Sequence, residues 1–288
     1  MKGRIIKVIS NDYTVKLDNN TKIVCKPRGV FRNKNITPLA GDIVEVDLEK
    51  SLIIDIYDRK NELKRPPVSN IDLAIVVVSS INPDFSTNLL DKMINIIEYN
   101  NIKPIIVITK SDLYFGDDIK EYINYYKSIG YEVFLNTEID KIKDSIKEKT
   151  IILTGQTGVG KSSLLNRLDE NLNLKTDEIS KALGRGKHTT RAIEFYELNT
   201  SLIADTPGFS SLSFIDMSKE DIRDNFIEFN KYRDNCKYRD CFHIKEDECY
   251  IKELVDKKVI IDDRYGNYVS FIKEKENEGI NFNIKGKR

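Results

Sequence analysis

The chain has 288 residues, enough for two or three domains of ordinary size; 40% of them are hydrophobic and 32% are charged. Lys and Arg together number 46, as do Asp and Glu, so the chain does not coat nucleic acid through bulk charge, although a local basic patch remains open. We find no apolar run long enough to span a bilayer and no signal-peptide core, and we therefore expect a cytoplasmic protein without a membrane partner.

Residues 1–66 contain five short runs in which apolar and polar side chains alternate. Turn residues such as Asn19-Asn20 and Gly41-Asp42 separate the runs. Five short strands in this length indicate a small antiparallel β-barrel. We interpret it as an OB-fold, with a β-sandwich or an SH3-like barrel as the alternative.

This first segment is also locally basic. Basic residues exceed acidic ones by 14 to 9 up to residue 66, and the stretch between Asn19 and Gly41 contains no acidic residue. Phe31 lies among the basic residues of that stretch. A barrel can hold RNA in this way, with lysine and arginine on the phosphates and an aromatic ring stacked on a base. A solvated loop is the equally weighted alternative.

A different pattern begins after residues 59–72, which we interpret as a linker because Pro66-Pro67 blocks a helix. Continuous apolar runs alternate with runs of helical periodicity up to about residue 214, which predicts a doubly wound, mostly parallel α/β sheet. Beyond it the chain is charged and helical, starting with a capping-box pattern at Ser218 and Asp221. The predicted domains are residues 1–66, 67–214 and 215–288.

The stretch "GQTGVGKS" matches the phosphate-loop pattern G-x-x-x-x-G-K-[ST], with a predicted strand before it and a predicted helix after it. The glycines allow backbone N–H groups to face phosphate oxygens, Lys161 adds a charge between the β- and γ-phosphates, and the Ser162 hydroxyl can ligate Mg²⁺. A glycine-rich turn without a ligand is the weaker alternative. The predicted nucleotide contacts are Gly155, Gln156, Thr157, Gly158, Val159, Gly160, Lys161, Ser162 and Ser163.

Two further motifs predict the switch segments of a GTPase. Asp205 and Gly208 in "DTPG" follow an apolar run, where Asp205 would hold Mg²⁺ through water and the Gly208 N–H would sense the γ-phosphate. The second motif, "GRGKHTTRAI", lies between the phosphate loop and "DTPG". There Thr190, with Thr189 as the second choice, would close on Mg²⁺ and the γ-phosphate when GTP is bound.

The stretch "TKSD", Thr109 to Asp112, resembles the base-reading motif N-K-x-D. The Asp112 carboxylate can accept from guanine N1–H and the 2-amino group together, and Lys110 would lie along the base plane. Thr109 stands where asparagine is usual, which leaves the usual amide contact open. A second guanine-side loop would lie near Asn136-Thr137. An ATP-using phosphate-loop enzyme is the alternative that Asp112 disfavours.

The base-reading motif precedes the phosphate loop, which is the order of a circularly permuted GTPase; a doubly wound sheet tolerates such a cut if the old termini lie close together. This order, with "GQTGVGKSSLLN", "GRGKHTTR", "DTPGF" and "RKNELKRP", resembles the ribosome small-subunit-dependent GTPase A (RsgA) family over essentially the whole chain. The resemblance implies an OB-fold, a permuted GTPase domain and a zinc domain. It also implies GTP hydrolysis to GDP, stimulated by the small ribosomal subunit, during late maturation of that subunit and its rRNA. We expect a monomer.

The predicted zinc site is a cluster of cysteines and one histidine with the spacing C-x4-C-x-H-x5-C. Three thiolates and one imidazole form a closed tetrahedral site with no place for a reactive water, which is typical of a structural zinc ion. A group of buried thiols is the alternative. The predicted ligands are Cys236, Cys241, His243 and Cys249.

The catalytic machinery has a gap. Many GTPases orient the attacking water with a glutamine after D-x-x-G, and that position is Phe209 here. We therefore predict slow intrinsic hydrolysis, with His188 and Thr190 as the catalytic residues; a contact of His188 with phosphate or RNA is the equal alternative. A binding module in which nucleotide only sets RNA affinity is the second function that the sequence permits.

Overall fold

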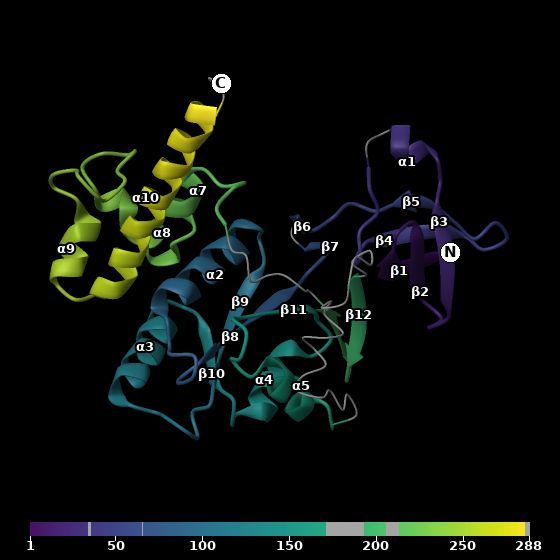
Figure 1. The fold of residues 1–288 in the computed structure, drawn as a ribbon, viewed down its shortest axis with the longest axis horizontal. Helices are drawn as coiled ribbons and strands as arrows, with labels where there is room; N and C mark the ends of the chain where they lie inside the picture. Colours follow the sequence, from purple (N-terminus) through teal and green to yellow (C-terminus); the bar gives the residue numbers. More distant parts are fainter. Residues whose placement is uncertain (34–35, 65, 171–192, 206–212, 286–288) are drawn as a thin grey trace.

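The computed structural model describes residues 1–33, 36–64, 66–170, 193–205 and 213–285, with the backbone alone at 32–33, 205 and 278–285 (Figure 1). Figure 1 shows a barrel at the N-terminal end, an α/β layer structure in the middle and a helical C-terminal part. Within these ranges, no helix combines the length and the apolar character that crossing a membrane would require.

The barrel has five strands in the order β1-β2-β3-β5-β4, and it closes through a second pairing between β1 and β4. Strands β3 and β5 run parallel and the other pairs run antiparallel. A short helix, α1 (Val30–Asn33), joins β3 to β4. The prediction of an OB-like barrel is confirmed. The strands are β1 (Lys2–Ile9), β2 (Asp12–Leu17), β3 (Lys22–Pro27), β4 (Ile43–Asp47) and β5 (Leu52–Ile56).

Phe31 does not lie on the surface of the barrel. Its side chain is 5% exposed and packs in the barrel core, in one cluster with Ile5, Val44 and Ile53. Phe31 belongs to α1, and its ring covers the barrel core from that helix. The interpretation of Phe31 as a stacking platform for an RNA base is therefore wrong.

The segment interpreted as a linker is an ordered hairpin of β6 (Glu62–Lys64) and β7 (Pro67–Ser69). Pro67 opens its strand, where a missing N–H is tolerated. The hairpin is tied to the barrel through Asp42, a fully buried residue whose carboxylate accepts from Arg59 Nε at 2.8 Å and from Ser69 Oγ at 2.6 Å. The segment therefore connects the barrel to the central sheet as an ordered hairpin, which the sequence did not predict because its contacts come from distant residues. The predicted domain boundaries stay a prediction.

The central sheet has five parallel strands in the order β10-β9-β8-β11-β13, followed by antiparallel β12. Helices α2 and α3 pack on one face, and α4 and α5 pack on the other. The prediction of a mostly parallel α/β sheet is confirmed. The elements are β8 (Leu73–Ser79), α2 (Thr87–Tyr99), β9 (Lys103–Thr109), α3 (Asp117–Ser128), β10 (Glu132–Leu135), α4 (Ile139–Ile146), β11 (Thr150–Thr154), α5 (Lys161–Leu168), β12 (Ile193–Leu198) and β13 (Ser201–Asp205).

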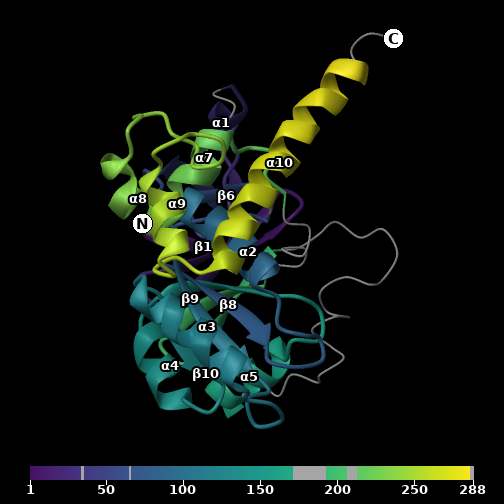
Figure 2. The ribbon, with the colours of Figure 1, turned by 90° about the vertical axis from the view of Figure 1, so that its left-hand side faces the viewer.

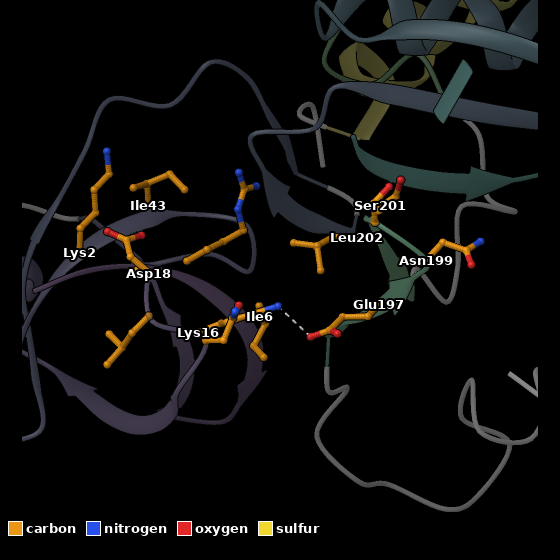
Figure 3. A pocket seen from close by; sticks show the side chains of 14 residues that line it. Lys2, Ile6, Lys16, Asp18, Ile43, Glu197, Asn199, Ser201 and Leu202 are labelled. Atoms are coloured by element: carbon orange, nitrogen blue, oxygen red, sulfur yellow. Dashed lines mark hydrogen bonds and ion pairs between the residues drawn. The ribbon is translucent and has the colours of Figure 1, made fainter. Parts of the chain in front are cut away.

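Barrel and central sheet are continuous, because β1 pairs antiparallel with β12 in the register Lys7 with Glu194. Ion pairs reinforce the junction: Lys7 Nζ lies 2.6 Å from Glu194 Oε2, and Lys16 Nζ lies 2.9 Å from Glu197 Oε1. Figure 3 shows the Lys16–Glu197 pair beside a cavity of about 470 Å³ between the barrel and the β12–β13 hairpin, with Leu202 on the side of the central sheet.

The C-terminal part consists of α7 (Lys219–Asp224), α8 (Ile227–Tyr232), the short 3-10 helix η2 (Arg233–Asn235), α9 (Tyr250–Asp256) and α10 (Asp262–Lys285). The predicted capping box is present, since Asp221 N donates to Ser218 Oγ at 3.0 Å and Ser218 N donates to Asp221 Oδ2 at 2.7 Å. Helices α7 and α10 both contact α2 (Figure 2).

A buried ion cluster fastens this C-terminal part to the central domain. The Arg264 guanidinium, on α10, donates to Asp91 of α2 at 2.5 Å and to both oxygens of Glu228 of α8 at 2.8 and 3.1 Å. Burial alone lowers the pKa of Arg264, but the two carboxylates outweigh it and hold that pKa well above its ordinary value. All three side chains are at most 2% exposed.

Candidate functional site

The phosphate loop connects β11 to α5, at the carboxyl end of the parallel sheet. Gly155 has φ of +148°, and a Cβ there would lie 2.3 Å from the carbonyl oxygen of Val77, so only glycine fits. Lys161 Nζ donates to the carbonyl oxygens of Gly155 at 2.7 Å and Gln156 at 2.8 Å. Its burial lowers the pKa of the Lys161 ammonium. The Lys161 ammonium therefore lies over the phosphate loop, where it would add a positive charge for the bound phosphates.

The remaining residues of the loop differ in exposure. Gln156, Thr157 and Gly158 are exposed, whereas the Val159 side chain is buried in the core beneath the loop. Ser162 and Ser163 occupy the first turn of α5, with Ser163 exposed and Ser162 half-buried. The backbone of the loop thus faces outward above an apolar anchor, as phosphate recognition by N–H groups requires.

The base-reading segment follows β9 and lies directly against the phosphate loop. Lys110 Nζ donates to the carbonyl oxygen of Gly158 at 2.9 Å and also to that of Asn82. The Thr109 hydroxyl is hydrogen-bonded to the carbonyl oxygen of Val159 and lies 3.1 Å from that of Val78. Two consecutive side chains therefore join the segment to the loop.

One cavity of about 450 Å³ brings the two motifs together. The Asp112 carboxylate lies at its exposed edge, and Gly160 and Ser163 line the side of the phosphate loop. Asn136 Nδ2 lies 3.4 Å from Asp112 Oδ1, while Asn136 Oδ1 accepts from Ser111 Oγ at 2.7 Å. The lining residues are Thr109, Lys110, Asp112, Asn136, Thr137, Gly160, Ser163, Leu164 and Arg167.

Sequence reasoning missed Leu164 and Arg167 in the wall of this cavity, and it missed Ser111, whose hydroxyl supports Asn136 from beside the cavity. The spacing of Ser163 and Arg167, one helical turn apart on α5, was a usable signal, because such residues share a helix face. The Ser111–Asn136 bond joins two different strand ends and left no local signal.

The predicted switch residues are only partly described. Asp205 is the last residue of β13, and β13 pairs with β11 in the register Ala204 with Ile152. Its backbone therefore lies at the same carboxyl edge of the sheet at which the phosphate loop begins. His188, Thr189, Thr190, Gly208 and Phe209 lie outside the described residues.

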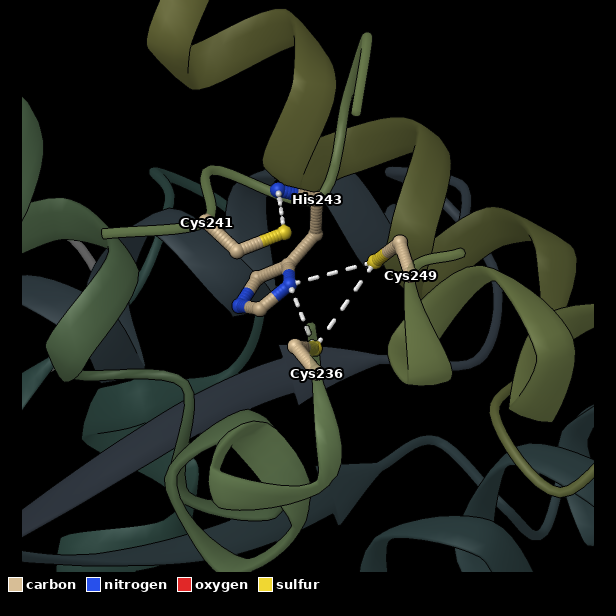
Figure 4. Close-up of side chains that lie close together, drawn as sticks. All are labelled: Cys236, Cys241, His243 and Cys249. Carbon is tan, nitrogen blue, oxygen red and sulfur yellow. Dashed lines mark hydrogen bonds between the residues drawn. The ribbon is translucent and has the colours of Figure 1, made fainter. Parts of the chain in front are cut away.

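The three cysteines and one histidine of the predicted metal site converge on one point (Figure 4). Their ligand atoms all lie within 4.8 Å of one another. His243 Nδ1 lies 3.3 Å from Cys249 Sγ and 3.6 Å from Cys236 Sγ, and these two sulfur atoms are 4.0 Å apart. A tetrahedral zinc ion with Zn–S bonds near 2.3 Å separates sulfur ligands by about 3.8 Å, so the cluster has the dimensions of a metal site.

The chemistry of the cluster also fits a cation. Burial lowers the pKa of the His243 imidazole to about 4, which keeps the ring neutral, as a metal ligand must be. Burial raises the pKa of the Cys241 thiol to about 12, and a bound cation reverses that preference by stabilising the thiolate. The cluster can therefore hold a metal ion.

Comparisons with known proteins agree with this geometry. The family model described as RsgA GTPase matches residues 56–215, and the one described as RsgA N-terminal domain matches residues 2–52. The small ribosomal subunit biogenesis GTPase RsgA 2 of Oceanobacillus iheyensis is 48% identical over 284 residues, which cover 95% of this chain and 97% of that protein. The corresponding RsgA of Staphylococcus aureus is 43% identical over 289 residues, with coverage of 97% and 99%.

Two solved structures extend the comparison to the fold. YloQ, described as a circularly permuted GTPase, superposes with a TM-score of 0.80 at 36% identity, covering 96% of this chain and 95% of YloQ. YjeQ from Thermotoga maritima gives a TM-score of 0.80 at 32% identity, covering 95% of this chain and 98% of YjeQ.

Proposed function

The chain belongs to the RsgA GTPase family and hydrolyses GTP, and from this premise we propose that it binds the small ribosomal subunit and acts late in the maturation of that subunit. The observation that carries the proposal is the cavity shared by Asp112 and the phosphate loop. A guanine base and a chain of phosphates are thereby held by one site. The names of the relatives supply the ribosomal partner.

Guanine recognition rests on the Asp112 carboxylate, which accepts from N1–H and the 2-amino group. Asn136 supports this carboxylate from the side at 3.4 Å, and Lys110 lies along the base plane while it braces Gly158. The phosphates lie along the exposed loop backbone at the N-terminus of α5, with Lys161 between the β- and γ-phosphates. Adenine lacks the paired donors, so ATP is excluded.

Ser162 and Thr190 would hold magnesium, and Asp205 would contact it through water. When bound, it supplies neutralisation of the charge that develops on the phosphate oxygens. Thr190, with Thr189 as the second choice, closes the first switch on the γ-phosphate. The Gly208 N–H senses the γ-phosphate in the second switch. His188 positions the attacking water, which compensates for Phe209 where many GTPases have glutamine.

One structural zinc ion is bound by Cys236, Cys241, His243 and Cys249. The closed set of four ligands and the burial of three of them support a structural role. Zinc would fix the loops between η2 and α9, whose Phe242 and Ile244 also pack against the apolar core of the C-terminal part.

The protein works as a cytoplasmic monomer on the subunit and its rRNA. All proposed nucleotide and metal ligands come from one chain, which supports a monomer. The basic excess of the barrel supports contact with rRNA phosphates. The barrel contributes charge to that contact, since its one aromatic ring in the basic stretch is buried.

The test is GTP turnover with and without purified small subunits. We expect slow turnover alone and a large stimulation by the subunits. A non-hydrolysable GTP analogue should trap the protein on the subunit, whereas GDP should release it. Retention that differs between the two nucleotides while turnover stays unstimulated would favour a binding module that uses nucleotide only to set RNA affinity.

A further inference from the structure

Thr109 occupies the position at which the base-reading motif usually has asparagine, and its surroundings are fully defined. The side chain is 4% exposed, and its hydroxyl lies against the carbonyl oxygens of Val159, in the phosphate loop, and Val78, at the end of β8. A Cβ added to Gly160 would lie 3.7 Å from the Thr109 side chain, so the threonine packs directly beneath the phosphate loop.

The hydrogen-bond inventory of a hydroxyl decides what Thr109 can do. A threonine has one O–H donor, and both of its partners here are carbonyl oxygens, which only accept. The single hydrogen is therefore used within the protein. On its major-groove edge guanine offers only acceptors, N7 and O6. Thr109 consequently has no donor left for that edge of the base.

We propose that Thr109 is a positioning residue that holds the phosphate loop in register with the base-reading segment and makes no contact with guanine N7. This inference rests on the proposed guanine site and assigns the coupling of its two halves to one hydroxyl. Base selection then lies with Asp112, and Thr109 sets how often the loop has its binding-competent shape.

The experiment replaces the hydroxyl and changes the base separately. Thr109→Val keeps the shape and removes the donor, and GDP and 7-deaza-GDP, which lacks N7, are titrated into wild type and variant. We expect the variant to lose affinity for both nucleotides by the same factor, roughly two- to tenfold. This is the factor by which the loss of one hydrogen bond would reduce the population of the loop in its binding-competent shape. Thr109→Ser, which retains the hydroxyl, should restore most of the affinity.

Two results overturn the inference. A loss by Thr109→Val that affects GDP and spares 7-deaza-GDP would mean that the hydroxyl reads N7. Unchanged affinity for both nucleotides would mean that the hydroxyl positions nothing. Should the valine variant lack wild-type circular dichroism, Thr109→Ala replaces it with the same expected ratio.

The proposed function has its own, separate outcome in the same experiment. If wild type binds neither GDP nor 7-deaza-GDP, the guanine site itself is refuted. If wild type binds GDP and Asp112→Asn shifts its preference towards XDP, the guanine site stands, and the Thr109 result alone decides the inference.

Discussion

Replacing Arg264 with methionine tests the joint between the C-terminal helices and the central domain. The guanidinium makes three hydrogen bonds of 2.5 to 3.1 Å to Asp91 and Glu228, and all three side chains are almost fully buried. Arg264→Met leaves both carboxylates buried without their cation. Removing one partner of a buried ion pair costs about 3–5 kcal/mol, which corresponds to a fall of about 10 °C in the unfolding midpoint.

The loss should depend on pH in a defined direction. Burial raises the pKa of Asp91, and the Arg264 charge opposes that effect. Without the arginine, the pKa of Asp91 in the folded state rises further above its unfolded value. The folded variant then gains a proton as the pH falls, so its stability deficit relative to wild type is largest near pH 8 and shrinks towards pH 5.

The assay is denaturant unfolding followed by circular dichroism and by tyrosine fluorescence, since the chain has no tryptophan. The matched control is Arg233→Met, whose partner Asp224 accepts at 2.8 Å with both side chains at least 35% exposed. We expect that control to change stability by less than about 1 kcal/mol. Equal losses in the two variants, or an Arg264→Met deficit that is independent of pH, would refute the reasoning.

Asp112→Asn should weaken GTP binding by about a hundredfold and favour XTP, because the amide meets one guanine donor with a donor of its own; competition binding measures this, and unchanged selectivity contradicts it. Lys161→Ala should weaken GTP binding by roughly tenfold or more through loss of a charge-assisted contact, with fluorescence titration as the measurement. His188→Ala should lower subunit-stimulated turnover about a hundredfold and spare GTP binding, and full stimulation in this variant would end the water-positioning idea. Cys241→Ser should reduce the zinc content from about one ion per chain and lower the unfolding midpoint, whereas a wild-type midpoint after chelation would argue for buried thiols.

Features carried by local patterns could be predicted from the sequence. The five barrel strands, the alternating strands and helices of the parallel sheet and the capping box at Ser218 each show a pattern within a short run of residues. The phosphate loop at Gly155 belongs to the same group, because its glycines and Lys161 are adjacent in the chain. The roles assigned to the individual site residues stay predictions.

Features that depend on contacts between distant residues could not be predicted from the sequence. The residues around Phe31 in the sequence have the composition of an RNA-binding loop. Only the closed barrel shows that the Phe31 ring packs in its core. Pro66-Pro67 indicates a stiff joint without a helix, and only the contacts of Asp42 show that this joint is a hairpin fixed to the barrel. Arg264 and Asp91 are 173 residues apart, so no periodicity could pair them.

The β12–β13 hairpin begins where the first predicted switch ends and finishes at Asp205, where the second one starts, and its outer strand is hydrogen-bonded to β1 of the barrel. Strands in one ladder turn together, because their bonds are directional. A change in the orientation of this hairpin would therefore be transmitted to the barrel through the paired backbones at Lys7 and Glu194.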